Sequence, residues 1–247
     1  MTKEVPCPVW NAVKDMIFAA LQSLHDVTGD YGASIILITI LMRVALTPLT
    51  LKQTRSMYEM QRIQPKIKEL QQKYKGDKEK LQEETLKFYQ DNKVNPFGGC
   101  LPLILQMPIF IALFQVLGGT AEHPGRLLAY LESLPAAEQA AAKAFWIFLP
   151  DITVTPGGMY AVGGLVAALP YLALVVLFGL SIWLPQQLMP GENQQKQVGL
   201  IMAVMMLYFG WVSPAGVLLY WVTSSVLGLI QQQLQIRFYS RSEGAQE

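Results

Sequence analysis

The sequence predicts an all-α, polytopic membrane protein with five transmembrane helices and a helical hairpin on the cytoplasmic side. The first observation is composition: 52% of the residues are hydrophobic and 15% are charged, whereas a soluble domain carries about 25% charged residues. Secondly, five apolar segments approach or reach the roughly 17–25 residues of a membrane-spanning helix. Thirdly, the basic residues are concentrated in one connection, which sets the orientation.

The elements follow one another in a regular order. Residues 1–32 form a lead-in with an amphipathic helix, and its polar and apolar faces suit the outer membrane surface. The predicted spans are residues 33–51, 96–118, 160–184, 198–212 and 213–234. The last two meet at a Ser-Pro-Ala-Gly sequence, residues 213–216. This helix-breaking sequence favours two spans in a hairpin over the alternative of one long buried helix.

The connections assign the two sides of the membrane. Residues 52–95 hold eleven of the nineteen basic residues, so this segment is expected in the cytoplasm. The loop of residues 119–159, called the outer loop below, holds only Arg126 and Lys143. The loop of residues 185–197 and the tail of residues 235–247 then return to the cytoplasm. The predicted topology therefore has the N-terminus outside and the C-terminus inside.

The basic segment has a helical pattern of its own. Apolar side chains recur at spacings of three and four along its first half, at Met60, Ile63, Ile67, Leu70 and Tyr74. Gly76-Asp77 interrupts the pattern before a second, shorter helix. A proline inside the first helix, Pro65, is expected to perturb it. The apolar seam is narrow, which predicts a mobile hairpin; a solvated hairpin with no special role is the alternative.

Arg43 is the most informative residue because it lies near the middle of the first predicted span. An arginine at the centre of a membrane helix costs about 2.5–3.5 kcal/mol even on lenient insertion scales. No Asp or Glu occurs in the other four predicted spans. The charge is therefore expected to lie in a water-filled cavity, with extension of the side chain to the membrane surface as the alternative.

Several uncharged polar residues accompany Arg43 in the spans. Thr39, Arg43 and Thr47 are spaced by four and would share one face of a continuous helix. Hydroxyl side chains in membrane helices commonly bond to their own backbone or join helices, so each one alone has a structural interpretation. The other members of this set are Gln106, Gln115, Ser181, Thr223, Ser224 and Ser225. Together with Arg43, the set could line a hydrated groove.

The sequence contains no recognisable catalytic or cofactor motif. Its only histidines, His25 and His123, are far apart in the chain, and its cysteines, Cys7 and Cys100, form no metal-binding pattern. We therefore expect no enzyme activity, no metal and no cofactor. Three functions remain open from the residues alone: a small-solute channel or transporter, a membrane-embedded hydrolase with little support, and a scaffold for other subunits.

Three groups of residues resemble the YidC/Oxa/Alb family of membrane protein insertases. The first is Leu-Met-Arg at residues 41–43 with Pro48-Leu49. The second is Asn-Pro-Phe-Gly-Gly-Cys-Leu-Pro at residues 95–102 with Gln-Met-Pro at residues 106–108. The third is Pro-Ala-Gly-Val-Leu-Leu-Tyr-Trp at residues 214–221 with three glutamines at residues 231–233. The chain looks like the short form found in Gram-positive bacteria.

The resemblance implies a positively charged hydrophilic groove that opens to the cytoplasm and to lipid. Arg43 would attract the acidic tail of a substrate there, and the substrate helix would pass into lipid along the second and fourth spans. The implied groove residues are Arg43, Thr39, Thr47, Gln106, Ser181, Tyr220, Trp221, Ser224 and Ser225. Ser225 is a departure, because the family often has asparagine there, which reaches further than serine.

The same resemblance implies partners and a location. Nascent membrane proteins and membrane lipid are the expected partners, with the ribosome and the Sec translocon as candidates and no direct nucleic-acid contact. The cytoplasmic hairpin would dock substrates through basic residues, namely Lys66, Lys73 and Lys80. The expected location is the bacterial plasma (inner) membrane, with several spans in a monomer.

Overall fold

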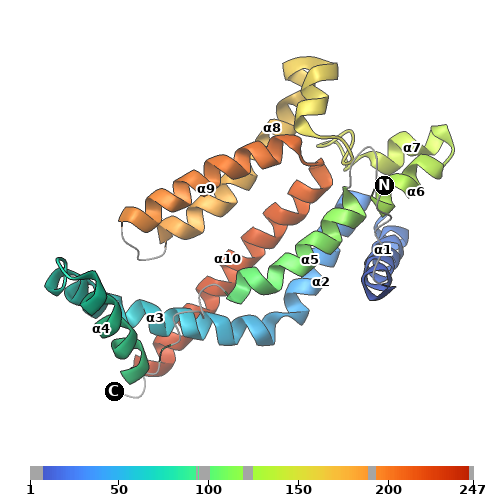
Figure 1. Ribbon diagram of the computed structural model, residues 1–247. Coiled ribbons are helices and arrows are strands. Elements are labelled where there is room, and N and C mark those ends of the chain that lie inside the picture. The colour runs from blue at the N-terminus through green and yellow to red at the C-terminus, as the bar shows by residue number, and fades with distance from the viewer. Residues whose placement is uncertain (1–7, 93, 95–100, 119–124, 189–192, 245–247) are drawn as a thin grey trace. The chain divides into compact units, whose positions relative to one another are not determined.

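The computed structural model describes residues 8–92, 94, 101–118, 125–188 and 193–244. These residues form helices and no β-strand beyond one isolated bridge, which confirms the all-α prediction. The helices are α1 (Pro8–Thr28), α2 (Tyr31–Ala45), α3 (Thr47–Lys73), α4 (Lys78–Asp91), α5 (Leu101–Leu117), α6 (Arg126–Ser133), α7 (Ala136–Lys143), α8 (Pro156–Leu188), α9 (Asn193–Val212) and α10 (Ala215–Gly244) (Figure 1). The predictions made for residues 1–7, 93, 95–100, 119–124, 189–192 and 245–247 lie outside the described residues.

The chain divides into two compact units. One comprises Met1–Val44 and Met107–Gly228, and the other comprises Ala45–Gln106 and Leu229–Glu247. The first unit contains an apolar core that draws on α1, α2, α5, α6, α8 and α10. Its most deeply buried side chains include Leu21, Ile35, Leu113, Tyr171, Phe178 and Leu218.

The outer loop closes one end of the first unit. Tyr171, fully buried in α8, donates a hydrogen bond from its hydroxyl to the Asp151 carbonyl oxygen at 2.8 Å. The Ile152 carbonyl oxygen accepts from Gly216 N at 2.8 Å, and the Val154 carbonyl oxygen accepts from Ala215 N at 3.0 Å. The first amides of a helix have no partner within the helix. The loop therefore provides acceptors for the first two amides of α10 and holds that end of the helix in place.

Two helices among the described residues are long and apolar enough to cross a membrane, Pro156–Leu184 and Ala215–Tyr239. The α1 and α2 helices would qualify together but are bent by 119° at their junction, while Gln106–Leu117 and Gly199–Val212 are shorter apolar helices. Each of the five predicted spans overlaps one of these helices. The number that crosses the bilayer stays a prediction.

The first predicted span, residues 33–51, does not coincide with one helix. Helix α2 ends at Ala45, and α3 begins at Thr47 and continues into the basic segment. The cause is Pro48, which lacks an amide hydrogen and whose ring would clash with a carbonyl one turn earlier in a continuous helix. Proline is tolerated in the first turn of a helix, which is where it lies in α3.

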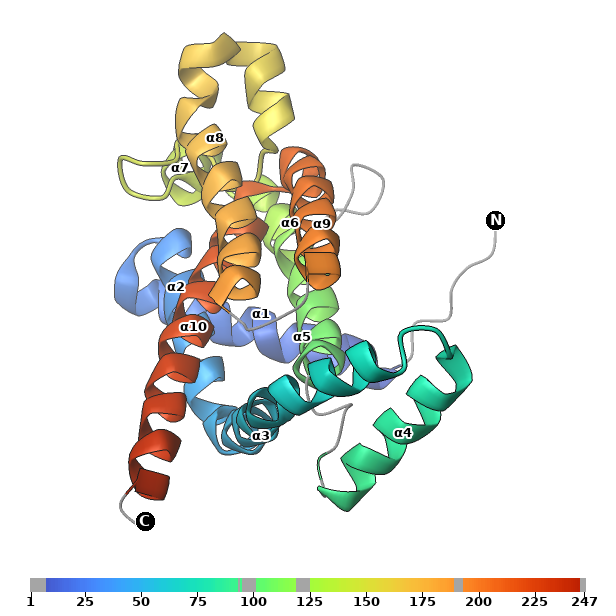
Figure 2. The ribbon, with the colours of Figure 1, turned by 90° about the vertical axis from the view of Figure 1, so that its left-hand side faces the viewer.

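Helix α8 also contains a break within the predicted span of residues 160–184. Gly164 has φ 69° and ψ −167°, a non-helical conformation that separates the first turns from the remainder of α8. Glycine adopts positive φ without the steric penalty of a Cβ atom. Figure 2 shows the short first part turning back into the long second part.

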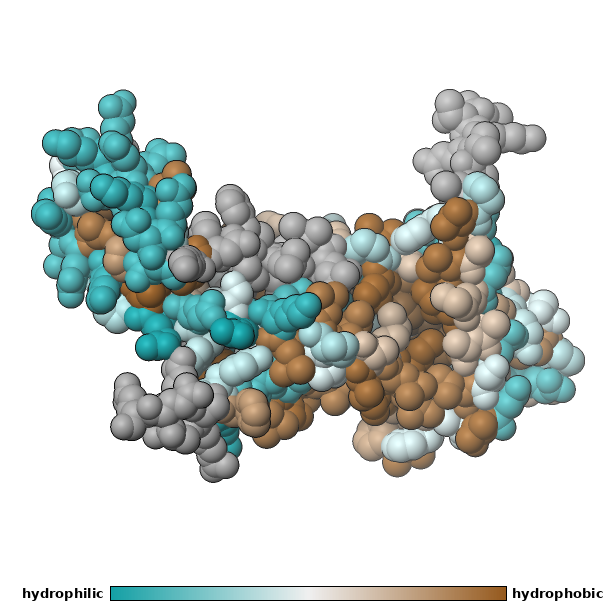
Figure 3. All heavy atoms as spheres, turned by 90° about the horizontal axis from the view of Figure 1, so that it is seen from below, coloured by the Kyte–Doolittle hydropathy of each residue, from teal (hydrophilic) through white to brown (hydrophobic). Residues whose placement is uncertain are grey.

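The second unit contains the predicted hairpin. Helix α4 packs against α3, and Asp77 begins α4 by accepting a hydrogen bond from Lys80 N at 3.1 Å (Figure 2). Ile67 is buried, and Ile63 and Leu70 are half-buried, in agreement with the apolar seam. Helix α3 runs through Pro65 without a break in its helical assignment, so the expected perturbation is not seen. The hairpin surface is mostly hydrophilic, as its teal colour in Figure 3 shows.

Candidate functional site

Arg43 lies in the last turn of α2 and reaches across to α10. Its Nε and Nη2 donate hydrogen bonds to the hydroxyl oxygen of Ser224 at 3.1 and 2.8 Å. Ser224 is 5% exposed, and Arg43 is half-buried. Both residues belong to the first unit. A hydroxyl group orients a guanidinium but does not neutralise it, so this contact leaves the positive charge in place.

The face of α10 beneath Arg43 is shaped by a glycine. Ser224 and Gly228 are one helical turn apart and share a face. A Cβ atom added at Gly228 would lie 3.0 Å from both Nη1 and Nη2 of Arg43. The guanidinium therefore lies directly over the glycine. Sequence reasoning did not select Gly228, although a glycine within an otherwise apolar helix is a signal for close approach of another group.

Two of the predicted groove hydroxyls are bonded to their own helices. Thr39 is buried, and its hydroxyl donates to the Ile35 carbonyl oxygen at 2.6 Å. Ser181 is buried, and its hydroxyl donates to the Phe178 carbonyl oxygen at 2.8 Å. These bonds satisfy the hydroxyl donors without a ligand, which is the common behaviour of Ser and Thr in apolar helices.

Thr47 is not on the same helix as Thr39 and Arg43. It begins α3, so the row does not continue along one helix. Its hydroxyl oxygen accepts a hydrogen bond from Gln231 Nε2 at 2.9 Å, and Thr50 accepts from the same atom at 3.0 Å. Gln231 was noted in the sequence within the run of glutamines but was not selected as a site residue. This polar contact lies wholly within the second unit.

The aromatic pair Tyr220 and Trp221, in the second turn of α10, is part of the packing of the first unit. Tyr220 is 2% exposed. The Trp221 ring meets the rings of Phe110 and Phe178 edge to face, with centroids 4.8 and 5.5 Å apart. Edge-to-face pairs of this kind are a favourable arrangement for aromatic side chains. Trp221 thus holds α10 against α5 and α8.

The remaining predicted residues have partly or fully accessible side chains. Gln106 on α5 and Ser225 on α10 are half-buried. The three hairpin lysines are exposed: Lys66, Lys73 and Lys80. No group of three or more His, Cys, Asp or Glu side chains that could hold a metal occurs within the described part of the chain.

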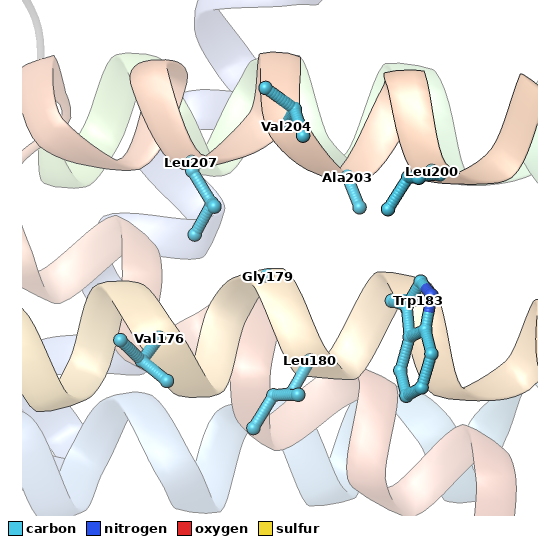
Figure 4. A pocket seen from close by; sticks show the side chains of 8 residues that line it. All are labelled: Val176, Gly179, Leu180, Trp183, Leu200, Ala203, Val204 and Leu207. Atoms are coloured by element: carbon cyan, nitrogen blue, oxygen red, sulfur yellow. The ribbon is translucent and has the colours of Figure 1, made fainter.

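An apolar cleft of about 320 Å³ lies between α8 and α9. Gly179 and Trp183 line it from α8, and Ala203 and Leu207 line it from α9, as Figure 4 shows. A Cβ atom at Gly179 would lie 2.6 Å from a terminal carbon of Leu207, so the glycine permits the two helices to approach. Helix α9 also exposes large apolar side chains, including Ile201, Met205 and Tyr208.

Comparison with known proteins identifies the family of the chain. The model of the 60Kd inner membrane protein family matches residues 23–242. A membrane protein insertase YidC from Fusobacterium nucleatum subsp. nucleatum is 34% identical over 226 residues, which cover 91% of this chain and 95% of the relative. One from Pseudoalteromonas atlantica is 38% identical over 225 residues, which cover 90% of this chain but 36% of the relative.

A solved structure shows the same fold. The active YidC insertase, in a crystal structure with its first transmembrane domain resolved, matches with a TM-score of 0.66 and 26% identity. The match covers 94% of this chain and 48% of that chain. These comparisons confirm the resemblance drawn from the residue groups around Arg43 and Tyr220. The chain therefore belongs to the 60Kd inner membrane protein family, in which its relatives are named membrane protein insertase YidC.

Proposed function

We propose that this protein inserts other proteins into the bacterial inner membrane, using Arg43 to attract the acidic tail of a substrate. The observation that carries the proposal is the Arg43 guanidinium, which is half-buried among apolar helices and oriented by the neutral hydroxyl of Ser224. A positive charge in a cleft with walls of low dielectric attracts an anion more strongly than the same charge in bulk water, because the walls focus its field. In this proposal the charge lies in a hydrated groove that is open to the cytoplasm.

The path into lipid is supported by exposed apolar faces in the first unit. Met107 and Ile111 are exposed on α5, and Leu200, Val204 and Met205 are exposed on α9. A substrate helix leaving the groove would contact these faces before it is surrounded by lipid. Transfer of apolar surface out of water supplies about 25 cal/mol per Å². The insertion step then needs no nucleotide and no covalent chemistry, in agreement with the expectation that the chain is not an enzyme.

The hairpin of α3 and α4 is proposed to receive substrates before they reach Arg43. Its exposed lysines, Lys66, Lys73 and Lys80, present positive charge on long side chains. Nascent membrane proteins are the proposed partners, and the ribosome and Sec translocon are the candidate delivery partners. The protein would act as a monomer with five spans.

The proposal is tested by insertion into liposomes that contain the purified protein. The substrate is a single-span protein with an acidic N-terminal tail, and the readout is protection of that tail from added protease. We expect Arg43→Ala to lower the initial rate by about tenfold, the effect of about 1.36 kcal/mol of lost attraction. Arg43→Lys should keep most of the rate, because the charge is retained.

The matched control is Arg55→Ala, which removes an exposed arginine that pairs with Glu59. It should insert at the wild-type rate, since exposed ion pairs contribute little. A second substrate with a neutral tail should be insensitive to Arg43→Ala. Equal loss with both substrates, or wild-type insertion by Arg43→Ala, would contradict the role proposed for this charge.

A further inference from the structure

The outer loop carries an exposed apolar tip that the proposed function does not use. Residues 144–150, Ala-Phe-Trp-Ile-Phe-Leu-Pro, include no charged side chain. Trp146, Ile147 and Phe148 are 63%, 94% and 57% exposed, and they are called the aromatic tip below. Contiguous exposed apolar side chains of this size mark a contact surface for a membrane or another molecule.

The aromatic tip is a folded structure and not a frayed end. Phe145 N donates to the Leu149 carbonyl oxygen at 2.8 Å, and Phe148 N donates to the Phe145 carbonyl oxygen at 3.1 Å. Phe145 and Leu149, on either side of the tip, are buried in the core of the first unit. The backbone thus projects the three middle side chains outward while anchoring their neighbours.

Trp146 is held in an unfavourable conformation. Its φ angle is 44°, in the left-handed region that residues with a side chain rarely adopt. Its amide donates to Asp30 Oδ2 at 2.9 Å, and the Asp30 Oδ1 atom accepts from Ala33 N at 2.9 Å. Strained conformations persist where surrounding contacts fix them, and they are concentrated at functional sites.

The same contacts fix the position of the aromatic tip along the axes of α2 and α10. Asp30 directly precedes α2, and a Cβ atom at Gly32 would overlap the ring of Phe145. On the other side, the Ile152 carbonyl oxygen bonds to Gly216 N at the start of α10. The aromatic tip therefore lies beside the N-terminal ends of two helices, α2 and α10 (Figure 1). This is the depth at which those helices would leave the hydrocarbon layer.

We infer that the aromatic tip inserts into the interfacial layer of the bilayer at the N-terminal ends of α2 and α10. Tryptophan favours this layer because its ring is apolar and its N–H can remain hydrated, and Ile147 and Phe148 add apolar surface beside it. Lys143 and Asp151 flank the apolar sequence and place polar groups at its base. The inference requires that α2 and α10 cross the membrane, and it is independent of which substrate Arg43 attracts.

The test places a fluorophore on the most exposed residue of the tip. Ile147→Cys is made in a Cys7→Ser, Cys100→Ser background, labelled with bimane and reconstituted in phosphatidylethanolamine–phosphatidylglycerol vesicles. Ala137→Cys on α7, which is also exposed and in the outer loop, is the matched control. Two quenchers are compared: aqueous iodide, and a lipid carrying a nitroxide near its headgroup.

We expect iodide to quench the label at position 147 about tenfold less than the label at position 137, because an ion must leave bulk water to reach the former. The lipid-borne nitroxide should show the opposite order. Iodide quenching that is equal at the two positions would overturn the inference. Protection of position 147 from both quenchers would also overturn it, because a protein partner or a second copy would then cover the tip.

The position of the aromatic tip can be tested separately from the proposed insertion function. Asp30→Ala removes the acceptor of the Trp146 amide while leaving Arg43 and Ser224 unchanged. We expect this variant to lose the lipid-borne quenching at position 147 by several-fold and to retain the preference for acidic substrate tails. If the quenching pattern is unchanged in the variant, Asp30 does not fix the depth of the tip.

Discussion

At the scale of the residue, the position of the Arg43 guanidinium is set by the side chains and backbone that contact it. The sequence identifies the charge, because an arginine in the middle of an apolar segment is costly and requires an explanation. It also places Ser224 in the candidate groove, but it does not identify Ser224 as the partner of Arg43. The two residues are 181 positions apart and meet only because α2 and α10 face each other in one rotation. The same limit applies to Gly228. Thr39 and Ser181 are polar residues of the type expected in a groove, but their hydroxyls bond to their own helices.

Gly228→Ala tests whether the position of the guanidinium matters. The added methyl would lie 3.0 Å from Nη1 and Nη2, so the guanidinium must shift and weaken its bonds to Ser224. Hydrogen bonds to charged groups contribute about 1.5–3 kcal/mol. We expect insertion of acidic-tailed substrates to fall several-fold. The melting temperature should stay equal or rise, because alanine favours a helix over glycine.

The control for this substitution is Gly76→Ala, where an added Cβ atom meets nothing within 4 Å. It should leave insertion unchanged in the same liposome assay. If Gly228→Ala inserts substrates at the wild-type rate while the crystal or spectroscopic position of Arg43 has shifted, then the close fit between Arg43 and α10 has no functional role.

At the scale of the element, the sequence predicts the existence of helices better than their ends. The hairpin is predicted from its apolar spacing and from Gly76-Asp77, and α3 and α4 are separated at that point. The break between α2 and α3 was not predicted, although Pro48 is its cause. The break at Gly164 was also missed, because glycine is tolerated in apolar helices and signals a break only when its backbone conformation is known.

The hairpin lysines provide a prediction at this scale. We expect the triple variant Lys66→Gln, Lys73→Gln, Lys80→Gln to lower substrate capture several-fold, because each exposed charge attracts an anionic partner over about 10 Å at 0.1 M salt. Capture is measured by crosslinking to a stalled nascent chain. The unfolding temperature should be unchanged, since all three side chains are exposed.

The same triple change to arginine is the control, because it preserves each charge. It should capture substrates as the wild type does. If the glutamine variant also captures them normally at low and at moderate salt, the hairpin is a solvated structure without a docking role.

At the scale of the whole molecule, composition and charge distribution predict a membrane protein, and family membership agrees with this. The structure confirms an all-helical chain within its described residues. Neither the sequence nor the structure alone gives the number of spans. Helix lengths such as the 17 residues of α5 lie at the lower limit for crossing a bilayer. The division into two units likewise has no signature in the linear sequence, since both units combine distant segments.

The predicted topology has a direct test in intact cells. Single cysteines at Ala137 on α7 and at Lys80 on α4 are exposed positions on connections assigned to opposite sides. A membrane-impermeant maleimide should label position 137 from outside the plasma membrane and position 80 only after the membrane is opened. Labelling of both positions from the same side would contradict the arrangement of five spans with the N-terminus outside.

We propose that Arg43 lies in water that is reached from the cytoplasm, and accessibility at position 43 tests this proposal most directly. Arg43→Cys is made in a Cys7→Ser, Cys100→Ser background and exposed to a membrane-impermeant maleimide from the cytoplasmic face of inverted vesicles. Lys66→Cys is the exposed control, and Ile35→Cys, at a position that is 0% exposed on the same helix as Arg43, is the buried control. If Arg43 lies in water that is reached from the cytoplasm, position 43 should be labelled at a rate close to that of position 66. Labelling as slow as at position 35 would mean that the charge is sealed in protein or lipid, and attraction of acidic tails by Arg43 would be contradicted.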